Sequence, residues 1–140
     1  MFSKTFFFAL IPSILAASFS VSVGSKNGLT FDPTSVVADI GDTIIFTVLS
    51  RNHSITSADF SGAVCPPPAG GAGLNPFDSG YLSDLDGSLP TFTYTVPSTE
   101  PQFAACMQAG GAHCRAGMTF AINPNSTLTY AQFNTNAANS

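Results

Sequence analysis

Residues 106–118 read Cys106-Met-Gln-Ala-Gly-Gly-Ala-His113-Cys114-Arg-Ala-Gly-Met118. This short segment contains a thiol, an imidazole and a thioether, three groups that bind transition metals. The chain has only two histidines, and the second one, His53, follows the apolar run at residues 43–49. The residues that could hold a metal are therefore concentrated in one loop and at the end of one strand-like run.

Two histidines, one cysteine and one methionine make up the ligand set of a blue-copper electron-transfer site. Imidazole suits Cu(II), whereas thiolate and thioether favour Cu(I). We therefore predict one type I copper ion as the cofactor, with metal ligands His53, Cys106, His113 and Met118.

Each of these residues also has an ordinary structural interpretation. A histidine at the end of a strand is often a polar turn residue, and Met118 can be a core residue, because methionine fills gaps readily. Asn52 is either an ordinary turn residue or a hydrogen-bonding residue that stiffens the Cys106 loop.

The chain has three cysteines, an odd number. In an oxidising compartment two of them should pair and one is left over, as a buried inert residue, an intermolecular disulfide or a metal ligand. In an extended segment the side chain of Cys114 would point away from that of His113. Cys114 could then reach Cys65, while Cys106 stays with His113.

Residues 1–18 resemble a secretory signal peptide, with Lys4, an apolar run at 6–15 and small residues at 16–18. An uncleaved anchor is the alternative, although the run is too short to span a bilayer. We predict a secreted, extracellular protein that can associate with the cell wall and has no stable membrane insertion after cleavage. The chain ends without a hydrophobic segment, which predicts no lipid anchor at that end.

Without residues 1–18, three basic residues remain against eight acidic ones, so the net charge is 3 − 8 = −5. Such a chain has no basic patch, which excludes nucleic acid as a partner. The expected partner is a redox protein or an extracellular small-molecule redox couple that the sequence does not identify.

Short β-branched and aromatic runs between turn residues predict an all-β sandwich in one domain, residues 19–124. The segment 61–90 is rich in Pro, Gly, Asn and Asp and predicts a long loop, and 43–49 is expected to be a central strand. Residues 125–140 are predicted to be a polar tail that is flexible or forms one short helical turn. The predicted strands are 19–24, 29–33, 35–40, 43–49, 91–96, 102–106 and 118–123.

Two tripeptides match the acceptor pattern for N-glycosylation. Asn125-Ser126-Thr127 lies in a plausible surface segment, and we predict that Asn125 is glycosylated. Asn52-His53-Ser54 also matches, but a glycan there would sit on the proposed metal centre, so we predict that it is unused.

Taken together, residues 20–124 resemble the cupredoxins, most closely the phytocyanin-type and related fungal secreted members. The resemblance implies a Greek-key cupredoxin β-sandwich, copper ligands at His53, Cys106, His113 and Met118, and a Cys65–Cys114 disulfide. It also implies single-electron transfer and no catalytic residues. The matching residues are Val21-x-Val-Gly24, Leu29-x-Phe31-x-Pro33, Gly41-Asp42, Asn52-His53-Ser54, Phe77-Asp78-Ser79-Gly80 and His113-Cys114-Arg-Ala-Gly117-Met118-Thr-Phe-Ala-Ile-Asn-Pro124.

Two departures from phytocyanins are present. Six residues separate Cys106 from His113, more than is usual in phytocyanins, and the preceding Phe103-Ala-Ala is less aromatic than expected. The alternative function is an extracellular cell-wall or surface interaction module that keeps the fold without redox activity. A hydrolase with Cys106 as nucleophile is disfavoured, because only Arg115 lies nearby to lower the pKa of the thiol.

Overall fold

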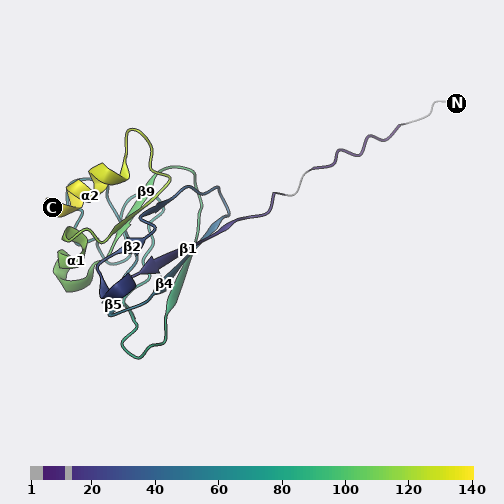
Figure 1. Ribbon diagram of the computed structural model, residues 1–140. Coiled ribbons are helices and arrows are strands. Elements are labelled where there is room, and N and C mark those ends of the chain that lie inside the picture. Colours follow the sequence, from purple (N-terminus) through teal and green to yellow (C-terminus); the bar gives the residue numbers. More distant parts are fainter. Residues whose placement is uncertain (1–4, 12–13) are drawn as a thin grey trace.

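The computed structural model describes residues 5–11 and 14–140. Part of the predicted signal peptide, residues 1–4 and 12–13, therefore lies outside the described residues. The described part of that segment extends away from the folded domain (Figure 1), and its large apolar side chains are exposed. Among the described residues, no helix combines the length and the apolar character needed to cross a membrane.

The protein is an all-β sandwich, as predicted. One sheet has the strand order β2-β1-β4-β8, the other has the order β3-β10-β9-β6, and β5 pairs with β7 in a small third sheet. The elements are β1 (Ser18–Val23), η1 (Ser25–Asn27), β2 (Phe31–Asp32), β3 (Ser35–Val36), β4 (Thr43–Val48), β5 (Asn52–His53), β6 (Thr56–Ala58), β7 (Leu82–Ser83), β8 (Thr91–Thr95), β9 (Gln102–Ala105), η2 (Gln108–Gly111), α1 (Ala112–Arg115), β10 (Thr119–Ile122) and α2 (Tyr130–Ala138).

In the first sheet, buried and partly exposed residues alternate along the central strand, as the sequence pattern indicated. Every second residue of β4 is buried, with Ile44, Phe46 and Val48 on the inner face. Strand β4 pairs in parallel with β1 on one side and antiparallel with β8 on the other, so it is central, as the sequence predicted. Its Phe46 packs edge-on against Phe120 of β10, with ring centroids 5.2 Å apart, which joins the two sheets.

The second sheet is buried on both faces. All four residues of β9 and all four of β10 are buried. One face packs on the first sheet, and the other lies under a smaller apolar cluster that includes Phe133 and Ala137 of α2. Strands buried on both faces do not alternate in sequence, which explains why the last three residues of β9 and of β10 are all apolar.

The prediction for residues 125–140 was wrong in its main point. This segment contains the nine-residue helix α2, whose first turn is capped by the Thr129 side chain accepting from the amide of Gln132. Only Phe133 and Ala137, four residues apart, are buried, so the apolar stripe is too narrow for a clear helical period. Asn125, just before the helix, is exposed, and its glycosylation stays a prediction.

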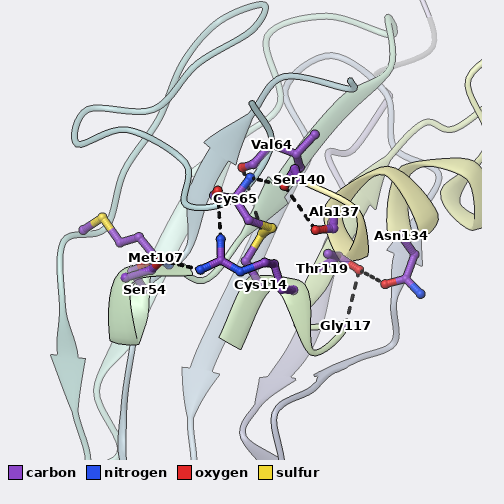
Figure 2. The surroundings of a disulfide bond; sticks show 12 residues. Ser54, Val64, Cys65, Met107, Cys114, Gly117, Thr119, Asn134, Ala137 and Ser140 are labelled. Carbon is purple, nitrogen blue, oxygen red and sulfur yellow. Dashed lines mark hydrogen bonds between the residues drawn. A yellow bond between two sulfur atoms is a disulfide. The ribbon is translucent and has the colours of Figure 1, made fainter. Parts of the chain in front are cut away.

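The segment 61–90 is irregular apart from the two-residue strand β7, as predicted. Its beginning is held by a disulfide between Cys65 and Cys114 and by the amide of Cys65 donating to the Ser140 hydroxyl at 2.9 Å. Figure 2 shows this disulfide beneath the end of α2. The disulfide implied by the resemblance is therefore present, and it connects the long loop to the segment that carries His113.

Candidate metal centre

Three predicted ligands from different elements meet at one end of the sandwich. His53 ends β5, Cys106 follows β9 directly, and His113 lies in α1. Their ligand atoms all lie within 4.8 Å of one another. A strand end supplies His53, as the sequence predicted, but His113 comes from a short helix and not from the loop that the sequence predicted.

The spacing of these atoms fits one metal ion. The Cys106 sulfur lies 3.8 Å from Nδ1 of His53 and 3.7 Å from Nδ1 of His113. An ion about 2.3 Å from a thiolate and about 2.05 Å from an imidazole nitrogen, as known for zinc, would separate sulfur and nitrogen by about 3.8 Å at trigonal angles. The two sulfur–nitrogen separations therefore match a single ion shared by all three side chains.

Met118 lies beside this cluster and is completely buried. Its amide donates to the carbonyl of His113 at 3.1 Å, and its carbonyl accepts from the amide of Cys106 at 3.2 Å. The residue also belongs to the main apolar core. Its core role is thus observed, and its role as a metal ligand stays a prediction.

Cys114 pairs with Cys65 for a physical reason that differs from the one expected. The expectation of this pair assumed an extended chain, but His113 and Cys114 lie in the short helix α1. In a helix consecutive side chains are rotated by about 100° around the axis. This rotation, and not strand alternation, directs His113 toward Cys106 and Cys114 toward the disulfide.

Hydrogen bonds to the Cys106 loop come from Ser54. The Ser54 amide donates to the Cys106 sulfur at 3.3 Å, and the Ser54 hydroxyl accepts from the Met107 amide at 2.9 Å. The Thr56 hydroxyl donates to a carboxylate oxygen of Asp78 at 2.9 Å and lies 2.8 Å from the Ser54 hydroxyl. Ser54, which is fully buried, therefore stiffens the Cys106 loop, a role that the sequence analysis considered for Asn52.

His53 is held against the backbone of Gly24. A Cβ atom at Gly24 would lie 2.8 Å from Nε2 of His53, so only glycine fits there without displacement. The ring is completely buried, and its Nε2 has no hydrogen-bond partner among the described residues. The other ring nitrogen, Nδ1, faces Cys106 and is therefore the one available for a metal.

The electrostatics of the site favour neutral imidazoles. Burial, followed by the nearby charges of His113 and Arg51, lowers the pKa of His53 to about 4. Burial and Arg51 also lower the pKa of His113. Both rings therefore carry free lone pairs near neutral pH, as metal ligation requires.

Burial raises the pKa of the Cys106 thiol, although the hydrogen bond from Ser54 opposes this effect. A buried thiol with a raised pKa is a poor nucleophile in the absence of metal. Cys106 is also fully inaccessible, which further disfavours the hydrolase alternative and an intermolecular disulfide. Two roles are left for it: an inert buried residue or a metal ligand.

Two curated proteins are similar to this chain in sequence. No protein-family model matches the chain. A probable GPI-anchored cupredoxin-1 of Arthroderma benhamiae is 31% identical over 119 residues, which cover 85% of this chain and 58% of that protein. An extracellular serine-rich protein of the same organism is 28% identical over 120 residues, covering 85% of this chain and 44% of that protein. The chain spans about half the length of these two relatives.

Solved structures share the same architecture. A pseudoazurin from a Sinorhizobium species superposes with a TM-score of 0.52 at 18% identity, covering 76% of this chain and 72% of that one. The chain has the cupredoxin fold, and one of its relatives in Arthroderma benhamiae carries the cupredoxin name. A reduced auracyanin from Roseiflexus castenholzii also has a TM-score of 0.52 at 18% identity, covering 76% of this chain and 95% of that chain.

The same fold also occurs within an enzyme. A copper-containing nitrite reductase from Thermus scotoductus has a TM-score of 0.51 at 14% identity, covering 83% of this chain and 24% of that protein. The cupredoxin fold alone therefore does not show whether a protein transfers electrons or catalyses a reaction, and that question has to be answered from the site. The closer likeness to phytocyanins stays a prediction.

Sequence reasoning found the clustered residues but gave no role at the site to two residues that support them, although both lie in stretches that carry the resemblance. Ser54 follows His53 directly in the chain, and that adjacency was the available signal. Gly24 is separated from His53 by 28 residues, and only the pairing of β1 with β4 brings it near.

Proposed function

We propose that this chain is a secreted or cell-surface protein that binds one type I copper ion and transfers single electrons. The observation that carries the proposal is the meeting of one thiol and two imidazoles with sulfur–nitrogen separations of 3.7 and 3.8 Å. The names of the two fungal relatives, one a GPI-anchored cupredoxin and the other an extracellular protein, support the location.

His53, Cys106 and His113 would hold the ion, with Met118 as a fourth ligand. Copper would supply a one-electron couple between Cu(II) and Cu(I), which this mixed set of nitrogen and sulfur ligands suits. The network around Ser54 holds the thiol loop in place through two hydrogen bonds, so the ligand geometry is set by the protein before the metal binds.

Burial of the three side chains differs in a way that suits electron transfer. His53 and Cys106 are completely buried and keep water out, whereas His113 is half-buried and reaches the surface. We propose that electrons enter and leave through the exposed edge of His113. The partner would be a redox protein or an extracellular small-molecule couple that approaches this edge.

A direct test is a visible absorption spectrum of the protein during titration with Cu(II). We expect an intense thiolate-to-copper charge-transfer band that saturates at one equivalent and disappears in Cys106→Ser. A matched control removes the other two cysteines together as Cys65→Ala and Cys114→Ala, and should keep the band because Cys106 remains.

Absence of the band, with one thiol still open to titration in the unfolded protein, would contradict the electron-transfer proposal. That result would favour the alternative of an interaction module that keeps the fold without redox activity.

A further inference from the structure

A buried carboxylate lies at the end of the sandwich opposite to the metal centre. Asp42 is 7% exposed and comes directly before β4, while the far end of β4 leads toward His53. One oxygen of Asp42 accepts from the amide of Ala17 at 2.7 Å, and the other accepts from the amide of Asp39 at 2.8 Å. Both partners are neutral, so the charge of this buried group has no counter-charge in these contacts.

Within the described part of the chain, basic side chains are not available at this end. Apart from Lys4, which lies outside the described residues, the basic residues are Lys26, Arg51 and Arg115. All three are near the metal centre. Lys26 is in η1, which directly follows Gly24, the residue that lies against His53. Arg51 comes just before β5 and donates to Asn27. Arg115 is in α1. The nearest charged neighbour of Asp42 along the chain, Asp39, is itself acidic.

We propose that proteolytic processing cleaves the bond between Ala16 and Ala17, and that the new α-ammonium group of Ala17 forms an ion pair with Asp42. The inference rests on the secretion that the proposed function includes. A secretory endopeptidase would add water across this bond, with hydroxyl joining the Ala16 carbonyl carbon and hydrogen joining the Ala17 nitrogen. The amine would then take up a proton near neutral pH.

The nitrogen that becomes charged is the same atom that already lies 2.7 Å from the carboxylate. Cleavage would convert a neutral amide donor into an ammonium donor without any movement of the chain. Charge-assisted hydrogen bonds of this kind are roughly twice as strong as neutral ones. Removal of the signal peptide would thus supply the counter-charge that Asp42 lacks.

The contacts of residues 17 and 18 argue against cleavage after Ser18, the boundary that the sequence predicted. The carbonyl of Ala17 accepts from the amide of Thr43 at 2.9 Å. Ser18 is the first residue of β1, pairs with Thr43, and its hydroxyl lies 2.8 Å from the Thr43 hydroxyl. Removing both residues would shorten the sheet and leave one Asp42 oxygen without its donor.

Residues before Ala17 contribute much less to the domain. Ile14 is 91% exposed and Leu15 is 89% exposed. With Ala16 and Ala17 they form one wall of a surface cleft of about 550 Å³, whose other wall includes Asp39, Ile40 and Thr99. Cleavage before Ala17 would remove most of that wall and open the Asp42 end of the domain to solvent.

The first test is the amino-terminal sequence and intact mass of the full chain after secretion from a eukaryotic host. We expect the protein to begin at Ala17. A beginning at Ser18 or Phe19, or retention of residues 1–16, would overturn the proposal. Neither readout needs copper, so a failed copper titration would not be mistaken for failure here.

A second test measures the ion pair itself. The rate of acylation of the α-amine at pH 7 is compared between the secreted protein and Asp42→Asn, both in a Lys26→Arg background where the α-amine is the only amine. We expect acylation to be about tenfold faster in Asp42→Asn, because loss of the carboxylate lowers the pKa of the amine. Asp39→Asn is the matched charge control and should change the rate much less.

Equal rates in the secreted protein and Asp42→Asn would overturn the ion pair. Should Asp42→Asn fail to fold, the Lys26→Arg protein acetylated at its α-amine replaces it. Acetylation should lower the urea concentration at the midpoint of unfolding, and an unchanged midpoint would equally overturn the proposal.

Discussion

Gly24 shows how one missing side chain positions a ligand. Its φ of +77° is a conformation that other residues adopt with strain, and a Cβ atom would lie 2.7 Å from the Ser50 hydroxyl and 2.8 Å from Nε2 of His53. The conformation and the close approach both require glycine. The position of the His53 ring is therefore determined by a residue that never touches the metal.

We predict that Gly24→Ala destabilises the protein and weakens copper binding by at least about tenfold, because the ring of His53 must move. Gly41→Ala is the matched control, since Gly41 has a φ of +91° but a Cβ atom there would have no neighbour within 4 Å. Both substitutions should show the backbone strain in urea unfolding, but only Gly24→Ala should change the copper affinity. Equal copper affinities in the two variants would contradict this role of Gly24.

Ser54 is hydrogen-bonded to Cys106 and to the residue after it, Met107. We predict that Ser54→Ala lowers the free energy of unfolding by about 1–2 kcal/mol, because the Met107 amide loses its acceptor. The charge-transfer band of the copper form should also shift or broaden as the thiol loop loosens. Asn52→Ala is the comparison and should leave both unfolding and the spectrum nearly unchanged. Larger effects of Asn52→Ala than of Ser54→Ala would instead indicate that Asn52 stiffens the Cys106 loop.

At the scale of elements, helix α2 completes the smaller apolar cluster on the outer face of the second sheet. Phe133 packs against Phe103 of β9, with ring centroids 4.7 Å apart, and stacks on Phe60 from the loop after β6 at 6.3 Å. Asn134 accepts from the Thr119 hydroxyl at 2.8 Å, and Ser140 accepts from the amide of Cys65 (Figure 2). The helix thus covers the outer face of the sheet that leads into the metal loop.

We predict that Phe133→Ala destabilises the protein by about 3–5 kcal/mol, as for other buried phenylalanines. Gln132→Ala, one residue earlier on the exposed side of α2, should change stability by less than about 0.5 kcal/mol. Urea unfolding followed by circular dichroism provides the measurement. A small effect of Phe133→Ala would mean that α2 is not part of the cooperative domain.

At the scale of the whole molecule, burial of His53 links folding to pH. Its pKa is about 4 in the folded protein against an ordinary value of 6.5, so between these pH values the unfolded chain binds more protons. Stability must therefore rise with pH across this window and fall as the pH drops from 6.5 to 4.

We expect the metal-free protein to lose stability of the order of 2 kcal/mol across this window from His53 alone. The measurement is the free energy of urea unfolding at several pH values, compared with that of His53→Gln. The difference between the two curves should slope in this window and be flat above it. Parallel curves would show that His53 takes up its proton in the folded state.

Much of the fold was readable because β-strands with one buried face alternate, as in β4, and because Gly, Pro and Asp separate them. Strands β5, β6 and β7 were missed, since two or three residues carry no period. Helix α2 was missed because its buried stripe consists of two residues. For the site, residue chemistry identified His53, Cys106 and His113, whereas Ser54 and Gly24 act through backbone and small-group contacts that leave little trace in a single sequence.

By itself, the sequence determined the chemistry of this protein: a donor set suited to copper, an odd cysteine, and a strand pattern that closes into a sandwich. These properties belong to residue types and local spacing, which are present before the chain folds. Tertiary structure alone decided that Ser54 holds the thiol loop, that α1 directs His113 and Cys114 apart, and that Asp42 meets the nitrogen of Ala17. The contacts of Ser54 and of Asp42 join segments far apart in the chain, and their distances are set only when both sheets pack.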